Sequence, residues 1–289
     1  MQRTVVCFLL LCVVLGVVGT LVAQDQSTTP PPKVLIIIRE FLKPGKAGST
    51  HEKTEGAFVN AMAAAKWPQH YLGMDSLTGL PRSLFLEGYD SFEAWEKDNQ
   101  AGQKNTAFSA SMDRASAADG ELLTSVEASA FTYNEEQSLH APVDIGKMRY
   151  FEISRYRVRP GHDKDWDAIV KAYRDAYDKA VPDTHYAVYD DYYGKDSAGS
   201  HIVIFPLKSL AEVDKGFGDY KKIETAIGED GLKKIADLEA ASIAESEVNV
   251  FQINPAESYA AESWVKSDPS FWKPKAAVPA KKAELKAKP

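Results

Sequence analysis

Cysteine is nearly absent from this chain. Its 289 residues include two cysteines, Cys7 and Cys12, and both lie in the apolar segment at the N-terminus. If that segment is removed, the remaining protein has no thiol, so it can form no disulfide and must be held together by packing. Catalysis by a thiolate and metal binding by cysteine are excluded for the same reason.

Several common site motifs are missing as well. The sequence contains no glycine-rich phosphate-binding loop, no Gly-x-Ser-x-Gly turn and no Asp-rich calcium loop. It also has no His-x-x-x-His or His-Glu-x-x-His pair. These absences argue against a nucleotide-dependent enzyme, a serine hydrolase and a calcium-binding module. We therefore predict no metal and no cofactor, and whether the protein is an enzyme stays open.

The N-terminus has the pattern of an export signal. A basic residue precedes the apolar run Val5–Val18, and a cleavage point follows at Ala23. We predict a signal peptide over residues 1–23 and a stiff, polar linker over 24–32, so that the protein is exported to the periplasm or secreted. The alternative is that Val5–Val22 stays uncleaved as an anchor, because it is just long enough to span a bilayer.

Charge separates the body of the protein from its C-terminus. The net charge is -7, although the end of the chain after Trp272 is rich in lysine. The body is therefore clearly acidic and repels nucleic-acid phosphates, so we expect no nucleic-acid partner, and no stable membrane insertion once the signal is cleaved. Residues 259–289 are predicted to be a C-terminal extension with a disordered Lys/Ala/Pro tail. Aromatic side chains at Trp264, Phe271 and Trp272 are expected to hold its first part on the body.

The most informative pattern that is present is an internal repeat. Features of the first half return in the second at a spacing of roughly 115 to 120 residues, about the length of one small domain. The matching pairs are Arg39 with Arg155, His70 with His185, Asp75 with Asp190, Gly79 with Gly194, Phe131 with Phe251 and Asn134 with Asn254. A repeat this long predicts a duplicated domain and not an array of short units.

Each half has the same predicted order of elements. Residues 33–139 and 147–258 are each assigned to a ferredoxin-like β-α-β-β-α-β unit, in which the second helical region follows the third strand. Such a unit has helices on one face of an antiparallel sheet, so the other face needs cover. The aliphatic run Val34–Ile38 predicts a strand buried on both faces. The fold class is therefore α+β, with two tandem units packed sheet to sheet as an intramolecular pseudo-dimeric barrel.

Two short segments carry a family resemblance. Arg39–Gly45 and Arg155–Gly161 each lead from a strand with aromatic and basic residues into a Pro-Gly turn before a helix. Together with the repeated strand order, they are similar to the opening of dimeric α+β barrel proteins, which include NIPSNAP-like and antibiotic-biosynthesis-monooxygenase-like modules. Members usually build the barrel from two chains, so the resemblance implies that this chain can build it alone, as a monomer or homodimer. Their functions range from quinol oxidation and haem breakdown to no known activity, so little chemistry is implied.

The repeated histidines His70 and His185 are the first candidate ligand-binding residues. Duplicated strands would place the two imidazoles at equivalent points, where they could face one cavity and bind a metal or haem. Metal sites, however, need three or more donors in a defined geometry, and no other donor lies at such a spacing from either histidine. The structural alternative is that each histidine forms a hydrogen bond at the start of its strand, while Tyr71 and Tyr186 pack on the opposite face.

Arg39, Arg155, Tyr186 and Asp190 complete the set of candidate ligand-binding residues. The arginines alternate with aliphatic residues, so each guanidinium group is expected at the edge of a core, where it pairs with a carboxylate or clamps the acid group of a ligand. Asp190 precedes a turn that contains glycine, where carboxylates commonly accept main-chain amides. Tyr186 belongs to a tyrosine cluster that the first half lacks, although strand alternation sends Tyr189 to the opposite face.

These features favour a binding protein over an enzyme. We predict an exported tandem barrel that binds a small, mostly apolar molecule or acts as a non-catalytic module. A barrel interior filled by side chains would argue against the binding role. One alternative is an oxidoreductase, either a cofactor-free monooxygenase or a haem-dependent enzyme, that uses His70 or His185. The other is an interaction protein anchored to the envelope by Val5–Val22.

Overall fold

The computed structural model describes residues 28–273. The expected signal peptide at residues 1–23, the first part of the linker at 24–32 and the lysine-rich end after residue 273 lie outside the described residues. Within residues 28–273, no helix combines the length and the apolar character that are needed to cross a bilayer.

Both halves of the chain alternate strands with helices in the same order. The first half comprises β1 (Val34–Leu42), α1 (Ser49–Ala65), β2 (Tyr71–Ser76), β3 (Arg82–Tyr89), α2 (Phe92–Lys104), α3 (Thr106–Gly120) and β4 (Leu123–Leu139). After the short helix η1 (Ile145–Lys147), the second half comprises β5 (Tyr150–Val158), α4 (Asp163–Ala180), β6 (Tyr186–Tyr193), β7 (Ser200–Leu207), α5 (Ala211–Ile227), α6 (Glu229–Ser242) and β8 (Ile243–Ile253). The short helices η2 (Pro255–Glu257), α7 (Glu262–Ser267) and α8 (Pro269–Trp272) follow.

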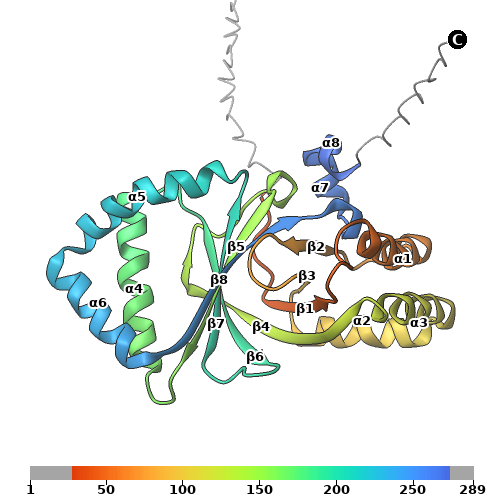
Figure 1. Cartoon of the computed structure of the whole chain (residues 1–289), viewed down its shortest axis with the longest axis horizontal. Helices are drawn as coiled ribbons and strands as arrows, with labels where there is room; N and C mark the ends of the chain where they lie inside the picture. The colour runs from red at the N-terminus through yellow and green to blue at the C-terminus, as the bar shows by residue number, and fades with distance from the viewer. Residues whose placement is uncertain (1–27, 274–289) are drawn as a thin grey trace, which may run out of the picture.

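The strands form one closed barrel in the order β1-β3-β2-β8-β5-β7-β6-β4 (Figure 1). All neighbouring pairs are antiparallel. Each half keeps the ferredoxin-like order, β4-β1-β3-β2 in the first and β8-β5-β7-β6 in the second. The halves join at two seams, where β4 pairs with β6 and where β2 pairs with β8. The predicted α+β fold and the pseudo-dimeric barrel within one chain are therefore confirmed.

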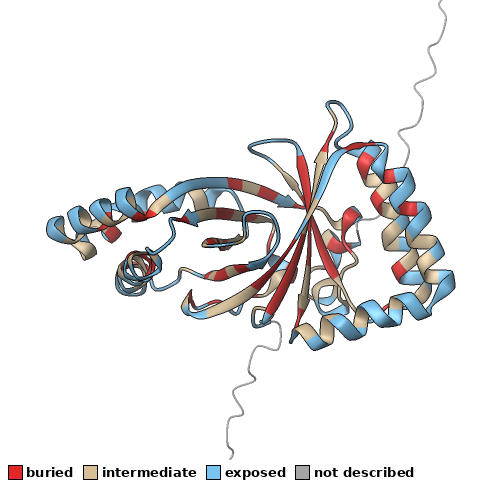
Figure 2. Cartoon of the chain, turned by 90° about the horizontal axis from the view of Figure 1, so that it is seen from below, coloured by how far each residue is buried: buried red, intermediate tan, exposed pale blue. Residues whose placement is uncertain are grey.

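Strand alternation divides the side chains between the barrel interior and the helix-covered outer face. In β1, Leu35 and Ile37 belong to the interior core, whereas Val34 and Ile36 pack against aromatic side chains of α2. The strand is thus buried on both faces over this run. Figure 2 shows buried residues concentrated in the strands, whereas the helices carry many exposed residues. All eight strands contribute apolar side chains to the interior core, which contains Leu35, Ile37, Leu72, Met74, Leu84, Leu86, Phe131, Phe151, Ile153, Tyr189, Ile202, Ile204, Phe251 and Ile253. This apolar part of the interior is a packed core and not a ligand cavity.

Each predicted second helical region consists of two helices. In the first half, α2 ends and α3 begins at Asn105, whose side chain accepts a hydrogen bond from the main-chain N–H of Phe108. In the second half, Gly228 separates α5 from α6 with a φ of 77°, which glycine adopts without strain. The breaks turn the helical layers, so that α1 packs on α3, and α4 contacts both α5 and α6 (Figure 1).

The C-terminal extension packs on the barrel core as short helices. Trp264 in α7, and Phe271 and Trp272 in α8, all contact the interior core. The buried Trp272 also donates a hydrogen bond from Nε1 to the main-chain carbonyl of Gly146 in η1. The aromatic side chains thus hold the first part of the extension on the body, and this part is helical.

Candidate functional site

The repeated histidines do not line a common site. Nδ1 of His70 lies 3.2 Å from the main-chain carbonyl oxygen of Tyr259, and its imidazole stacks on the Tyr259 ring. Nδ1 of His185 bonds in the same way with the carbonyl oxygen of His140. Other strands separate β2 from β6 in both directions around the barrel. Each histidine therefore ties the start of its strand to a neighbouring segment.

Asp190 and its repeat, Asp75, lie at the two seams between the halves. Nδ2 of Asn134 in β4 donates a hydrogen bond to Oδ2 of Asp190 in β6 at 3.1 Å. Nδ2 of Asn254, just after β8, donates to Oδ2 of Asp75 in β2 at 2.8 Å. The repeated Asp and Asn residues thus pair across the halves. Asp190 therefore links the two halves of the chain at the seam between β4 and β6. The predicted role in a turn did not include this contact.

Arg39 and Arg155 enter the barrel from equivalent positions on β1 and β5. Nη2 of Arg39 donates to Oγ of Ser129 at 2.6 Å, and its Nε lies 3.8 Å from the carboxylate of Glu127. Nη2 of Arg155 donates to Oγ of Ser200 at 3.3 Å, whereas its buried Nε has no hydrogen-bond partner. Burial, followed by the positive charge of Arg155, lowers the pKa of Arg39. The two guanidinium groups therefore lie near each other in a polar part of the barrel interior.

A buried carboxylate lies close to these arginines. Asp191 in β6 is 9% exposed, and neither of its carboxylate oxygens has a hydrogen-bond partner within the described part of the chain. Burial raises its pKa to about 6, although the positive charges of Arg39, Arg155 and His201 act to lower it. The unfavourable desolvation of this carboxylate thus exceeds the attraction of its neighbours.

We expect Asp191→Asn to stabilise the protein above about pH 7 and to have little effect near pH 4. Because the pKa is raised, the folded state binds the proton more tightly than the unfolded chain does, and stability from this group is lost as pH rises through about 6. The shift from 3.8 to about 6 corresponds to about 3 kcal/mol. Urea denaturation across this pH range measures the difference between variant and wild type. Asp237→Asn, at an exposed position, is the control, and an equal gain for Asp191→Asn at low pH would contradict the explanation.

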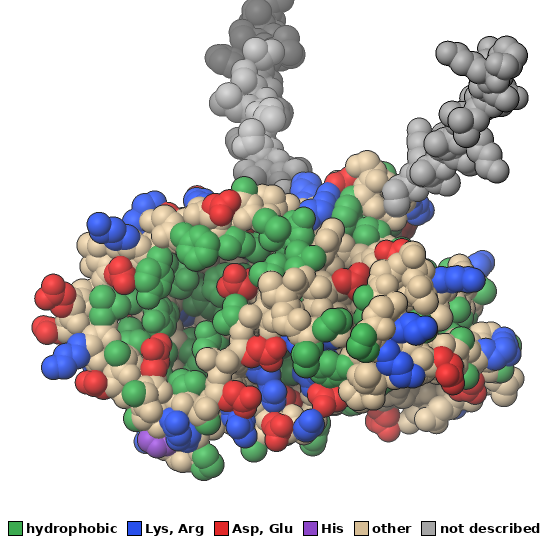
Figure 3. All heavy atoms as spheres, in the orientation of Figure 1, with side chains coloured by type: hydrophobic (Ala, Val, Ile, Leu, Met, Phe, Trp, Pro, Cys, Tyr) green, Lys and Arg blue, Asp and Glu red, His purple; other side chains and the backbone are tan. Residues whose placement is uncertain are grey.

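Tyr186 lines a large cavity between the sheet of the second half and the helices α4, α5 and α6. The cavity has a volume of ≈ 1180 Å³. Figure 3 shows hydrophobic side chains gathered around a hollow on this side of the molecule. The lining is dominated by aromatic and aliphatic side chains, among them Tyr156, Trp166, Tyr173, Tyr177, Tyr186, Phe205, Phe217, Tyr220, Ile223 and Ile243. Cavities with such linings are typical sites for small apolar ligands.

The second half carries smaller side chains than the first at two paired positions beside the cavity. Ser154 on β5 pairs with Val203 on β7, and both line the cavity. The equivalent pair in the first half, Ile38 and Phe85, lines a cavity of only ≈ 360 Å³. Isoleucine and phenylalanine fill space that serine and valine leave open. The duplication has therefore produced one closely packed half and one open half.

Two carboxylates add a polar side to the large cavity. Burial raises the pKa of both Glu152 and Glu239. The hydroxyl of Tyr173 donates to Oε1 of Glu239 at 3.4 Å. A hydroxyl or amine of a ligand can donate to these carboxylates in the same way.

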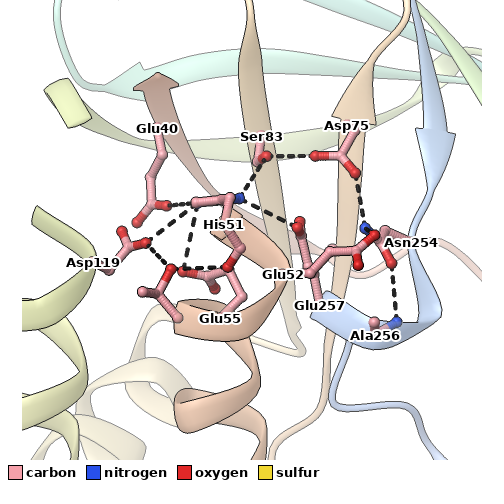
Figure 4. A network of polar contacts seen from close by, with 12 residues as sticks. Glu40, His51, Glu52, Glu55, Asp75, Ser83, Asp119, Asn254, Ala256 and Glu257 are labelled. Carbon is pink, nitrogen blue, oxygen red and sulfur yellow. Dashed lines mark hydrogen bonds and ion pairs between the residues drawn. The ribbon is translucent and has the colours of Figure 1, made fainter. Parts of the chain in front are cut away.

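A buried cluster around His51 in the first half was missed by the sequence analysis (Figure 4). His51 on α1 has no exposed surface, and the carboxylates of Glu40, Glu55, Asp119 and Glu257 surround its imidazole. Burial acts to lower the pKa of His51, but hydrogen bonds to Glu257 and Glu40 raise it to about 10. Burial also raises the pKa of Glu55 to about 9. The cluster therefore combines several acidic groups with one imidazole at a largely buried position.

The sequence contained one local signal for this cluster. His51 and Glu55 are four residues apart on α1 and share a helix face. The other carboxylates come from β1, α3 and η2, so no sequence spacing brings them together. Glu257 comes close because Gly73 has no side chain, since a Cβ there would lie 2.4 Å from the main-chain oxygen of Glu257.

Comparisons with known proteins give likenesses of structure alone. No model of a known protein family matches the chain, and no curated protein matches it. A putative monooxygenase from Fusobacterium nucleatum has a TM-score of 0.51 at 13% identity, over 78% of this chain and 94% of that chain. An anthrone oxidase-like protein has a TM-score of 0.47 at 17% identity, over 77% and 92% of the two chains. A mutant chlorite dismutase from Candidatus Nitrospira defluvii has a TM-score of 0.46 at 8% identity, over 83% and 98%.

At such identities, a likeness shows the fold and not the activity. The likeness to the Fusobacterium nucleatum protein extends over both halves of this chain. It agrees with the closed eight-stranded barrel and with the duplicated strand order. The chain therefore shares the fold of this solved protein, and both halves of its closed barrel are supplied by one polypeptide.

Proposed function

We propose that this protein is an exported binding protein for a small, mostly apolar molecule. The observation that carries the proposal is the cavity of ≈ 1180 Å³ between the sheet of the second half and α4, α5 and α6. The cavity lies on the helix-covered face of the sheet, so binding does not require space inside the packed barrel. Export is proposed from the signal-like residues 1–23, which lie outside the described residues.

The lining favours a particular kind of ligand. Tyr177, Tyr186 and Phe205 form an aromatic group with ring centroids 5.0 to 6.2 Å apart. Such a group favours a flat apolar or aromatic molecule. Glu152 and Glu239 provide hydrogen-bond acceptors beside this mostly apolar lining. We therefore expect a neutral ligand with at least one hydroxyl or amine group.

Narrowing the cavity at its sheet should weaken binding. Ser154→Ile combined with Val203→Phe gives the second half the side chains that the first half carries at Ile38 and Phe85. We expect the purified protein to bind the neutral dye Nile red and the double variant to bind it at least about tenfold more weakly, which corresponds to about 1.4 kcal/mol. Fluorescence titration gives both dissociation constants.

Leu77→Phe is the matched control, because it adds an aromatic ring at an exposed turn outside the cavity. Circular dichroism should show that both variants keep the fold. If the double variant is folded and binds Nile red as tightly as the control does, the cavity is not the binding site and the proposal is wrong.

A cofactor-free monooxygenase activity is the second candidate function. It is favoured by the shared fold with the protein described as a putative monooxygenase, and by a cavity large enough for an aromatic substrate. Oxygen uptake by the purified protein, measured across a panel of quinols, would support it if Ser154→Ile/Val203→Phe abolishes the uptake. A protein that binds quinols without consuming oxygen has the binding function alone.

The cavity residues do not fit a haem with an axial histidine. Among the described lining residues, His185 is the one histidine. It is exposed, and its Nδ1 bonds with the carbonyl oxygen of His140. Haem proteins that use histidine place it against the iron inside the pocket. We therefore expect no Soret band that depends on His185 when haemin is added.

The anchored alternative concerns residues outside the described part of the chain. Val5–Val22 would keep the protein at a membrane if it stayed attached, in place of the proposed export. Mass spectrometry of the mature protein distinguishes the two, because a chain that begins at Gln24 supports export and an intact N-terminus supports the anchor.

A further inference from the structure

The cluster around His51 has the spacing of a metal-binding site. Nε2 of this histidine lies 3.2 Å from Oε2 of Glu40, 3.5 Å from Oδ1 of Asp119 and 3.7 Å from Oε1 of Glu55. Ligands about 2.1 Å from a tetrahedral zinc ion are about 3.4 Å apart. The nitrogen and the oxygens thus have the separation of atoms that share one ion, and all donor atoms lie within 4.8 Å of one another.

Hydrogen bonds account for only part of this arrangement, since Oγ1 of Thr54 donates to Oδ1 of Asp119 at 2.7 Å. Nε2 carries at most one proton, which it can donate to one carboxylate and not to three. Glu55 is 3% exposed, and its Oε1, which points towards the imidazole, has no hydrogen-bond partner (Figure 4). Within residues 28–273, these carboxylates form ion pairs with His51 and with no lysine or arginine. Buried carboxylates without enough counter-charge are unstable unless a cation or protons neutralise them.

The other imidazole nitrogen is arranged as in metal-binding histidines. Nδ1 of His51 lies 3.2 Å from Oε1 of Glu257, which has no exposed surface. A carboxylate that accepts the Nδ1 proton fixes the tautomer whose Nε2 lone pair is available to a metal. The Glu257 segment is itself held on β2, because Oγ of Ser258 accepts a hydrogen bond from the main-chain N–H of Gly73.

We propose that Nε2 of His51 and the three carboxylates around it bind one divalent transition-metal ion. These carboxylates belong to Glu40, Glu55 and Asp119. An imidazole nitrogen with carboxylates suits Zn²⁺ or Mn²⁺ better than Mg²⁺ or Ca²⁺, which prefer oxygen ligands alone. The ion joins β1, α1 and α3. It has a route of entry, because the three carboxylates line the cavity of ≈ 360 Å³ together with Tyr71, whose buried hydroxyl has no partner.

The metal site is independent of the proposed ligand cavity, which lies in the other half of the chain. Isothermal titration of the purified full chain with ZnCl₂ and MnCl₂, after removal of metals with a chelator, tests it. We expect about one ion per chain and a higher Tm with the ion, because an ion that binds the folded state stabilises it. Glu55→Gln removes a ligand charge and keeps the side-chain size, and should weaken binding by more than about 100-fold. Glu257→Gln, at a positioning residue, should weaken binding by about 10-fold to 100-fold.

Glu93→Gln is the matched control. Glu93 is an exposed helix glutamate that pairs with Lys97 on α2, and it is not one of the proposed ligands. This variant should bind the ion with wild-type affinity. Circular dichroism on all three variants separates loss of metal binding from loss of fold.

Three results would overturn the proposal. If the wild-type chain binds neither ion, the carboxylates share protons instead, and Glu55→Gln should then raise the Tm. If wild type and folded Glu55→Gln bind the ion equally, the ion lies elsewhere. If Ca²⁺ or Mg²⁺ binds as tightly as Zn²⁺ and Mn²⁺, the assignment to a transition metal is wrong.

Discussion

Trp272→Ala is expected to lower the free energy of unfolding by about 3 to 5 kcal/mol. The side chain is 5% exposed and packs on the barrel core beside Trp264 and Phe271. Its removal leaves a cavity and also deprives the carbonyl of Gly146 of the hydrogen bond from Nε1. Urea denaturation followed by far-UV circular dichroism measures the loss.

Phe217→Ala provides the comparison, because Phe217 on α5 is a large apolar residue that is 77% exposed. Its substitution should change the free energy of unfolding by less than about 0.5 kcal/mol. If Trp272→Ala costs less than about 1 kcal/mol, the helices α7 and α8 dock on the barrel without taking part in its cooperative unfolding.

Phe131→Ala and Phe251→Ala are each expected to lower the free energy of unfolding by about 3 to 5 kcal/mol. These two residues are a repeated pair, with exposures of 0% and 2%, and both lie in the interior core. Phe131 is opposite Leu35 in β1, and Phe251 is opposite Phe151 in β5. Similar burial in one shared core predicts similar losses, which guanidinium denaturation can compare.

The shape of the transition gives a second test of this pair. Because both rings belong to one core, each single variant should still unfold in one step, with all probes of structure coinciding. A variant that unfolds in two steps, with one half of the chain lost before the other, would show that the halves have separate cores. That result would contradict the packing described here.

The architecture could be predicted because the repeat and the strand pattern carry it. A spacing of one small domain indicated the duplication, and the uninterrupted run Val34–Ile38 indicated a strand with two buried faces. The closed barrel follows from these two facts. The repeated Asp75 and Asn254, and Asp190 and Asn134, were visible as pairs, although their meeting across the seams required the strand register.

The chemistry was not predictable to the same extent, because it depends on residues that are distant in sequence. His51 lies close to Glu257 only because a glycine in β2 lets the chain approach, and no local pattern reports such an approach. The large cavity depends on how α4, α5 and α6 lie over the sheet of the second half, and the small side chains of Ser154 and Val203 only add to it. Periodicity shows which face a side chain takes, but not how far a helix stands from a sheet.

The seam between β2 and β8 has a consequence for how the chain reaches its fold. It pairs Met74, Asp75 and Ser76 with residues 251–253, near the end of the barrel sequence. During synthesis, β2 has an open hydrogen-bonding edge until β8 has been made, and such an edge can recruit strands from other chains. Contacts between segments so far apart also slow folding. Pairing of β8, the last strand within residues 28–273, with β2 therefore closes the barrel and removes this open edge.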